Sequence, residues 1–244
     1  MDKMAVERLS GVKAIFLEKM ILVGGCCLAF GAAFANISVV LRTGISVSHL
    51  TGDVSRLSMD LSHISPKVMV EACRIGAAAL AFFLGAFLSG FLIHHPTLDF
   101  ARPYGRTVIG IGVIFICSAL MIERFPLSGI ALAAFGCGIQ NALASKYKGI
   151  ILRTTHLTGL MTDFGVAMGM KIRGYDVPNR NYVVPALLVL SFFLGGVISG
   201  VVYFFGKIDT IFLVGCGYFI AGILWSIGKH LWFPEIIREM TDEN

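Results

Sequence analysis

Long apolar stretches separated by short polar ones dominate the pattern of this chain. Six of these stretches are long enough, and poor enough in charge, to cross a bilayer, whose hydrocarbon core takes about twenty residues of helix. They are residues 20–41, 66–93, 107–122, 126–145, 182–205 and 210–228. The pattern therefore predicts an all-α membrane protein with six transmembrane helices.

Two polar stretches interrupt this pattern at matching places. His49-Leu50-Thr51-Gly52 follows the first apolar stretch, and His156-Leu157-Thr158-Gly159 follows the fourth. Unpaired polar groups in hydrocarbon cost several kcal/mol each, so an apolar chain has few reasons to keep such residues between its spans. We interpret the two HLTG segments, residues 43–62 and 148–170, as the functional region of the protein.

An internal repeat relates the two halves of the chain. Phe30-Gly31 matches Phe135-Gly136 at an offset of 105, and the HLTG motifs match at an offset of 107. Phe82-Phe83-Leu84-Gly85 matches Phe192-Phe193-Leu194-Gly195 at an offset of 110. Three matches in the same order indicate a duplication. Each half is predicted to contain three spans and one HLTG segment.

The predicted organisation is one membrane domain with short flanking segments. Its parts are an amphipathic or disordered N-terminus at 1–19, repeat 1 at 20–122, repeat 2 at 126–228 and a C-terminal tail at 229–244. With the N-terminus inside, fourteen Lys and Arg residues fall on the cytoplasmic side and five on the outer side. The positive-inside rule therefore predicts that both termini are cytoplasmic.

Three spans in each repeat would insert the second repeat upside down relative to the first. The two HLTG segments would then enter from opposite faces and meet near the midplane as re-entrant segments, an arrangement typical of secondary transporters. Asp53, Arg56 and Asp60 favour the re-entrant form, because charges are costly on a lipid-facing span. If each HLTG segment instead spans the membrane, the repeats are parallel.

Helical spacing places several polar side chains of the HLTG segments on shared faces. His49, Asp53, Arg56 and Asp60 follow one another at intervals of four, three and four residues. Arg56 and Asp163 occupy similar places in the two segments and have opposite charges, so we predict an ion pair between repeats that is either static or a gate. Gly52 and Gly159 permit a helix break, which would turn a positive helix end towards an anion or a polar solute.

Each of these features also has a purely structural interpretation. The histidines and hydroxyl groups can serve only as hydrogen-bonding contacts between helices. The candidate substrate-binding residues are Asn36, His49, Thr51, Gly52, Gln140, Asn141, Thr155, His156, Thr158 and Gly159. The candidate gating or coupling residues are Asp53, Arg56, Arg153, Thr162 and Asp163.

Composition narrows the class of function further. The chain is 56% hydrophobic and 14% charged, and its net charge of +5 is the loop charge expected of a membrane protein rather than a nucleic-acid footprint. Six cysteines in apolar surroundings are interpreted as packing residues. No motif pairs a nucleophile with a base, holds a metal or binds a phosphate, so we expect neither an enzyme nor a cofactor.

At the HLTG segments the chain resembles a known family, the YoaK-like DUF1275 (UPF0700) bacterial membrane proteins. The second half carries the more specific match, Gly138-Ile139-Gln140-Asn141-Ala142 followed by Arg153-Thr154-Thr155-His156-Leu157-Thr158-Gly159 and Thr162-Asp163. In the first half, many relatives have Asn where this chain has Asp53. The resemblance implies a multi-span protein of the bacterial inner membrane and names no substrate.

The function predicted from these observations is transport, by a carrier or a channel, of a small polar or anionic solute bound between the repeats near the bilayer midplane. A different class stays open, a non-transporting membrane binding or assembly protein in which the HLTG segments are structural. Besides the solute and the lipid bilayer, the sequence indicates no nucleic-acid partner, and it leaves a homo-oligomer open.

Overall fold

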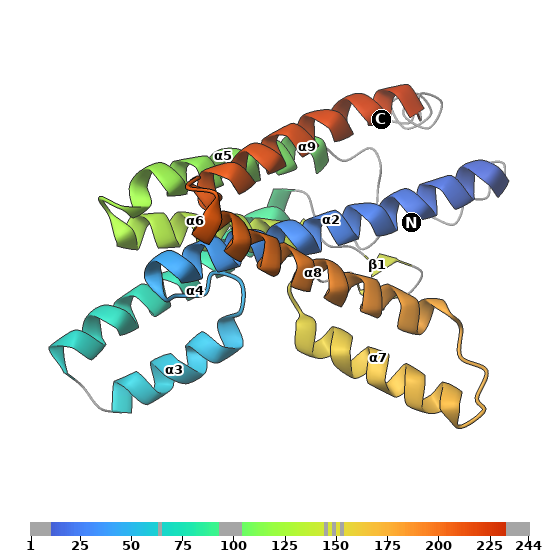
Figure 1. Cartoon of the computed structure of the whole chain (residues 1–244), viewed down its shortest axis with the longest axis horizontal. Coiled ribbons are helices and arrows are strands. Elements are labelled where there is room, and N and C mark those ends of the chain that lie inside the picture. Colours follow the sequence, from blue (N-terminus) through green and yellow to red (C-terminus); the bar gives the residue numbers. More distant parts are fainter. Residues whose placement is uncertain are drawn as a thin grey trace.

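The computed structural model describes residues 11–62, 65–92, 104–143, 146–147, 150–151 and 154–232. This part of the chain forms helices and one short antiparallel pair of strands (Figure 1). The helices are α2 (Gly11–Thr43), α3 (Leu50–Ser62), α4 (Pro66–Leu92), α5 (Tyr104–Ile122), α6 (Pro126–Leu143), α7 (Leu157–Ile172), α8 (Arg180–Phe205) and α9 (Thr210–Trp232). The strands are β1 (Lys146–Tyr147) and β2 (Ile150–Ile151).

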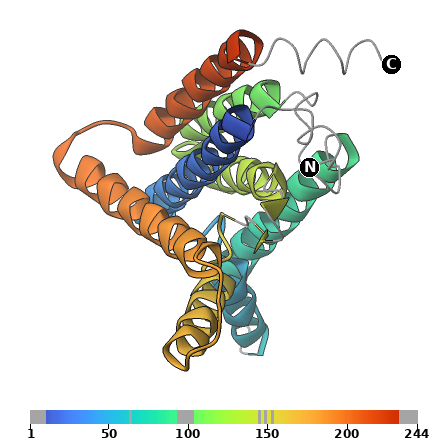
Figure 2. The same ribbon diagram turned by 90° about the vertical axis from the view of Figure 1, so that its right-hand side faces the viewer.

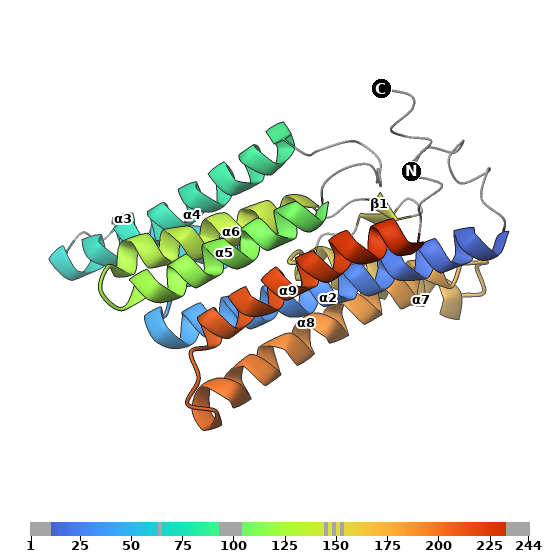
Figure 3. The same ribbon diagram turned by 90° about the horizontal axis from the view of Figure 1, so that it is seen from above.

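Six of these helices are long and apolar enough to cross a membrane, as the hydrophobic pattern predicted. The spans are Lys19–Thr43, Val68–Phe91, Tyr104–Ile122, Pro126–Leu143, Arg180–Phe205 and Thr210–Leu231. Seen from above, the long helices run broadly along one direction (Figure 3). Many of their outer side chains are large and apolar, as a lipid-facing surface requires. The chain is therefore an α-helical multi-pass membrane protein.

The helix of the first span begins earlier than predicted. Residues 11–19, assigned from the sequence to an amphipathic or disordered segment, are helical and continuous with the span. Residues 1–10 and 233–244 lie outside the described part. The start of α2 and the end of α9 lie at the same end of the molecule (Figure 1), as an even number of spans requires.

The remaining two helices, α3 and α7, coincide with the HLTG segments and are shorter. They contain 13 and 16 residues, which corresponds to about 20 and 24 Å of helix. Both begin near the middle of the molecule and run towards opposite ends of it (Figure 1). Both also lie on the same side of the bundle (Figures 1 and 2). Their first turns are thus directed towards the middle of that side.

Glycines let the long helices approach each other closely at two equivalent crossings. A Cβ atom on Gly195 of α8 would lie 2.2 Å from the carbonyl oxygen of Phe30 in α2, and one on Gly85 of α4 would lie 2.1 Å from that of Phe135 in α6. Real Cβ atoms do not come so close, so both crossings depend on glycine. Phe30 and Phe135, and likewise Gly85 and Gly195, are the residues that the sequence repeat matches.

A third crossing joins α5 to α9. A Cβ atom on Gly112 would lie 2.7 Å from the Gly215 carbonyl oxygen, and one on Gly105 would lie 2.9 Å from the Gly222 carbonyl oxygen. The two helices are therefore antiparallel where they touch, because the earlier glycine of α5 meets the later glycine of α9. At the repeat offset of 110, Gly105 matches Gly215 and Gly112 matches Gly222. The contact between Gly105 and Gly222 is therefore equivalent to the contact between Gly215 and Gly112.

Candidate functional site

The chain between α2 and α3 is buried and is held by one asparagine. Ile45 and Val47 are almost completely buried. The Asn36 Oδ1 atom accepts hydrogen bonds from the backbone N–H groups of Val47 at 2.9 Å and Ser48 at 3.2 Å, and from the Ser46 hydroxyl at 2.9 Å. Buried backbone N–H groups without a helical partner need another acceptor, and Asn36 provides it.

The equivalent asparagine of the second half holds the chain that leads into α7. The Asn141 Oδ1 atom accepts a hydrogen bond from the Thr155 hydroxyl at 2.8 Å. The neighbouring Gln140 Nε2 donates to the Leu28 carbonyl oxygen of α2 at 2.7 Å and to the Thr154 hydroxyl at 3.3 Å. Asn36, Asn141, Gln140 and Thr155 thus position the entries to the two short helices.

The two histidines stand at the starts of the short helices in different surroundings. His49 is half-buried, and its ring lies edge-on to Phe192 of α8 with the centroids 5.1 Å apart. Burial lowers the pKa of the His49 imidazole and so favours its neutral form. His156 is exposed, makes no capping bond to α7 and lies over Gly159, where a Cβ atom would be 2.8 Å from Nδ1.

The remaining HLTG residues lie in the first turns of α3 and α7. Thr51, Gly52 and Thr158 are exposed, and Gly159 is half-buried beneath His156. His156 provides no capping acceptor, so the first backbone N–H groups of α7 gain none from it. The first turn of α7 can therefore donate hydrogen bonds to a group that lies just beyond the helix N-terminus.

The polar side chains of α3 divide between two faces. The half-buried face towards α4 consists of Leu50, Asp53, Leu57 and Asp60, and the other residues of α3 are exposed. Burial raises the pKa of the Asp53 carboxyl group, and the nearby Arg56 opposes that rise.

The predicted ion pair between Arg56 and Asp163 is not formed. Arg56 Nη2 instead binds Glu71 Oε1 of α4 at 2.5 Å. The reason is packing, since α3 lies against α4 whereas α7 lies against α8, and the two short helices run to opposite ends. Asp163 and Thr162 are exposed, and the Thr162 hydroxyl donates to the Thr158 carbonyl oxygen. Arg153 lies outside the described residues.

Three buried polar atoms near these entries have no hydrogen-bond partner in the described part of the chain. They are the Ser48 hydroxyl oxygen just before α3, the Asp53 Oδ2 atom in the first turn of α3, and the Gln140 Oε1 atom of a completely buried side chain. Buried polar groups are nearly always hydrogen-bonded in native proteins, so each is a place where a ligand or water can supply the missing bond. Among the described residues no three His, Cys, Asp or Glu side chains come together as a metal site would require.

Other polar contacts were missed at the sequence level. Arg42 binds Asp209 and Glu123, and Ser38 binds Ser199. Arg42 has no signal of its own in the sequence, where it resembles any other loop charge. The paired glycines of α5 and α9 had a usable signal, a spacing of seven residues that recurs at the offset of the repeat.

Comparison with known proteins gives one family. The model of the family described as "Protein of unknown function (DUF1275)" matches residues 24–225. This match covers both HLTG segments and four complete spans, together with most of the first and of the last span. No curated protein and no solved structure matches the chain.

Proposed function

The chain belongs to the DUF1275 family, and from its geometry we propose that it is a transporter or channel for a small polar or anionic solute. The solute site lies between the first turns of α3 and α7, near the bilayer midplane. We further propose a bacterial inner membrane location with both termini in the cytoplasm. The cycle involves binding and conformational change, without covalent chemistry.

The observation that carries the proposal is the placement of α3 and α7. Each begins near the middle of the molecule after a buried, non-helical entry and runs out to its own end (Figure 1). Non-helical backbone at membrane depth is tolerated only inside protein or along an aqueous cavity. The N-terminal turns of both helices have a positive partial charge, which attracts anions and polar oxygen atoms.

The packing of the long helices supports two inverted three-span repeats. The α2–α8 and α4–α6 crossings use equivalent glycines, and the antiparallel α5–α9 crossing exchanges its glycine pairs at the repeat offset. A two-fold axis in the membrane plane relates elements in this way, and transporters with such repeats bind solute at the repeat interface. In this arrangement α3 and α7 are re-entrant segments from opposite faces.

The candidate residues take different roles in this proposal. His49, Thr51, Gly52, His156, Thr158 and Gly159 border the solute, whereas Asn36, Asn141 and Thr155 hold the entries in place. Gln140 offers its free Oε1 atom to a hydrogen-bond donor on the solute. Asp53, Arg56, Arg153, Thr162 and Asp163 are assigned to gating or coupling, with Arg56 acting through Glu71.

One observation favours the alternative of a structural role. The Asn36 carboxamide oxygen already accepts three hydrogen bonds from the protein, which leaves it nothing for a solute. If all polar groups of the HLTG segments were used in this way, the protein would be a membrane binding or assembly protein. The exposed Thr51 and Thr158 are the residues that separate the two functions.

The test is the water accessibility of single cysteines at Thr51 and Thr158 in a variant without the six native cysteines. A membrane-impermeant thiol reagent is applied to oriented vesicles from each side in turn. We expect both positions to react, from opposite faces, with rates that change when glycerol or nitrate is added as a neutral or anionic probe. Phe193→Cys, on an exposed apolar position of α8, is the lipid-facing control and should stay unlabelled.

Lack of reaction at both positions from either face would reject the aqueous pathway and favour the structural alternative. Uptake of glycerol or nitrate by proteoliposomes gives a second readout. We expect His156→Ala and Thr158→Ala to lower this uptake while the protein remains monodisperse. Unfolding of these variants, rather than loss of uptake, would assign the HLTG residues to the structural role.

A further inference from the structure

One end of the molecule is tied together by a bidentate ion pair. The Arg42 guanidinium, in the last turn of α2, lies 3.0 Å from Asp209 Oδ1 through Nη2 and 3.1 Å from Asp209 Oδ2 through Nη1. Nη1 also lies 3.3 Å from Glu123 Oε1 in the turn between α5 and α6. The side-chain exposures of Arg42, Asp209 and Glu123 are 15%, 37% and 79%, so the pair with Asp209 is the more shielded of the two.

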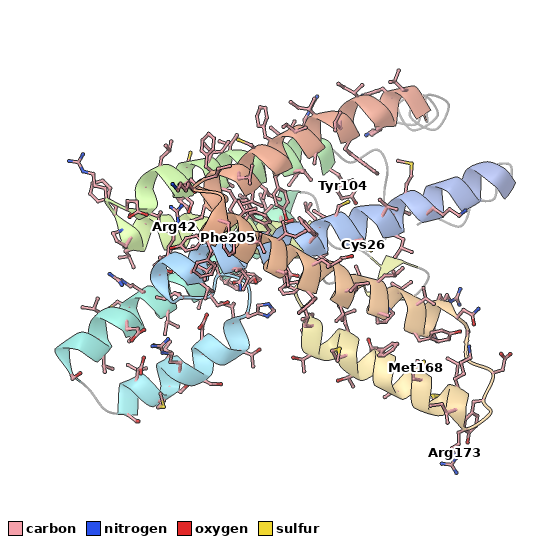
Figure 4. All side chains as sticks on the ribbon, viewed as in Figure 1. Cys26, Arg42, Tyr104, Met168, Arg173 and Phe205 are labelled. Atoms are coloured by element: carbon pink, nitrogen blue, oxygen red, sulfur yellow. The ribbon has the colours of Figure 1, made fainter. Side chains whose placement is uncertain are left out.

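The Asp209 carboxylate is fixed before it meets Arg42. Its Oδ1 atom accepts hydrogen bonds from the backbone N–H groups of Ile211 and Phe212, both at 2.9 Å, and so caps the start of α9. The carboxylate therefore needs little reordering to bind the guanidinium. Figure 4 shows Arg42 near the turn between α8 and α9 and Arg173 at the far end of α7.

Polar contacts continue along the same end of the α2–α8 interface. The hydroxyls of Ser38 and Ser199 lie 3.0 Å apart, and that of Ser199 also lies 3.0 Å from the Phe34 carbonyl oxygen. Both serines are completely buried. Beyond the crossing of Phe30 and Gly195, the other end of the interface is an apolar cluster that includes Ala29 and Leu188.

The two ends of this interface therefore resist separation differently. Apolar side chains slide or separate without losing directional bonds, and lipid tails can replace their contacts. Separation of the polar end would instead break the bonds of the buried Ser199 hydroxyl to α2 and the shielded pair of Arg42 with Asp209. The close contact between Gly195 and Phe30 lies between the ends and is suited to be a pivot.

We propose that the Arg42–Asp209 ion pair is a lock between the repeats that keeps the α2 C-terminal end of the transport path closed. Arg42 belongs to the first repeat and Asp209 to the second, so the pair breaks whenever α2 and α8 separate at this end. The inference rests on the proposed transport function. With the lock formed, the protein is closed at the Arg42 end, and the solute site opens towards the end where α2 begins.

The test uses Ser199→Cys as a nearly isosteric reporter buried directly beneath the lock. In the variant without native cysteines, its labelling by an impermeant thiol reagent from the Arg42 side is compared with that in Arg42→Gln and Asp209→Asn backgrounds. Asparagine can keep the cap on α9 while removing the charge. We expect labelling to become at least tenfold faster in both backgrounds and to stay slow in Arg42→Lys.

Arg124→Gln is the matched control, because Arg124 is a neighbouring cation that stacks on Phe125 without belonging to the lock. Labelling that is equally slow in the wild-type, Arg42→Gln and Asp209→Asn backgrounds would overturn the lock. If Arg42→Gln is not monodisperse, Asp209→Asn alone decides the outcome.

Uptake of glycerol and nitrate into proteoliposomes separates this inference from the proposed function. Slower uptake in the two lock variants, together with faster labelling, supports both. Faster labelling in a protein that takes up neither probe supports a lock on a conformational change and counts against transport of solutes of these two kinds. Unchanged labelling with normal uptake rejects only the lock.

Discussion

At the scale of single residues, the two asparagines show what a polar side chain does inside an apolar helix. Asn36 is 4% exposed, and its amide oxygen accepts from two backbone N–H groups and one hydroxyl of the chain before α3. The amide oxygen of Asn141 accepts from the Thr155 hydroxyl before α7. Their cost in the membrane is offset because they satisfy polar groups that would otherwise be unpaired.

Replacing Asn36 tests this positioning role. Asn36→Leu leaves the N–H groups of Val47 and Ser48 without an acceptor, which costs about 1–3 kcal/mol for each group. We expect a clear fall in the thermal unfolding temperature in detergent. Asn36→Asp keeps an acceptor oxygen and should recover at least half of the loss. Equal destabilisation by Leu and Asp would show that the carboxamide oxygen is not the group that matters.

At the scale of elements, the sequence predicted the membrane spans, which depend on the composition of each segment. It did not predict the partners of the charged side chains, which depend on the helices that lie alongside. The six spans were predicted because hydropathy is a property of each segment alone. The prediction of an ion pair between Arg56 and Asp163 was wrong, because the partner of a charged side chain depends on which helix lies alongside. Here α3 packs against α4, which places Glu71 next to Arg56. The roles of Arg42 and Asp209 were missed for the same reason.

The contact between α5 and α9 gives a prediction at this scale. In Gly112→Ala the new Cβ atom would lie 2.6 Å from the Phe219 nitrogen and 2.7 Å from the Gly215 carbonyl oxygen, so the backbones must separate. Overpacking of this kind costs about 1–3 kcal/mol, and we expect a lower unfolding temperature. Gly110→Ala, on the same helix, has nothing within 4 Å and should be neutral. Equal effects of the two changes would contradict the close crossing.

At the scale of the whole molecule, the two halves differ in how they are held. The residues that match between the halves include those of the glycine crossings and the two asparagines. The Arg42–Asp209 pair lies at one end of the described structure, so the two ends of two otherwise similar halves differ. The repeat is predicted from residues that the two halves share. Arg42 and Asp209 belong to none of the matched motifs, so their pairing becomes visible only in the three-dimensional structure.

The orientation of the repeats is decided by where α3 and α7 end. If these helices are re-entrant, Ser62 at the end of α3 and Tyr175 just beyond α7 lie on opposite faces, outside and cytoplasmic respectively, because the chain turns back at each helix start. If both helices cross the membrane fully, Ser62 and Tyr175 lie on the same face.

Both residues are exposed. We expect an impermeant thiol reagent added outside intact cells to label Ser62→Cys. Tyr175→Cys should react only after the cells are opened. Labelling of both or of neither from outside would require parallel repeats, and with them a solute path that does not lie between two facing helix ends.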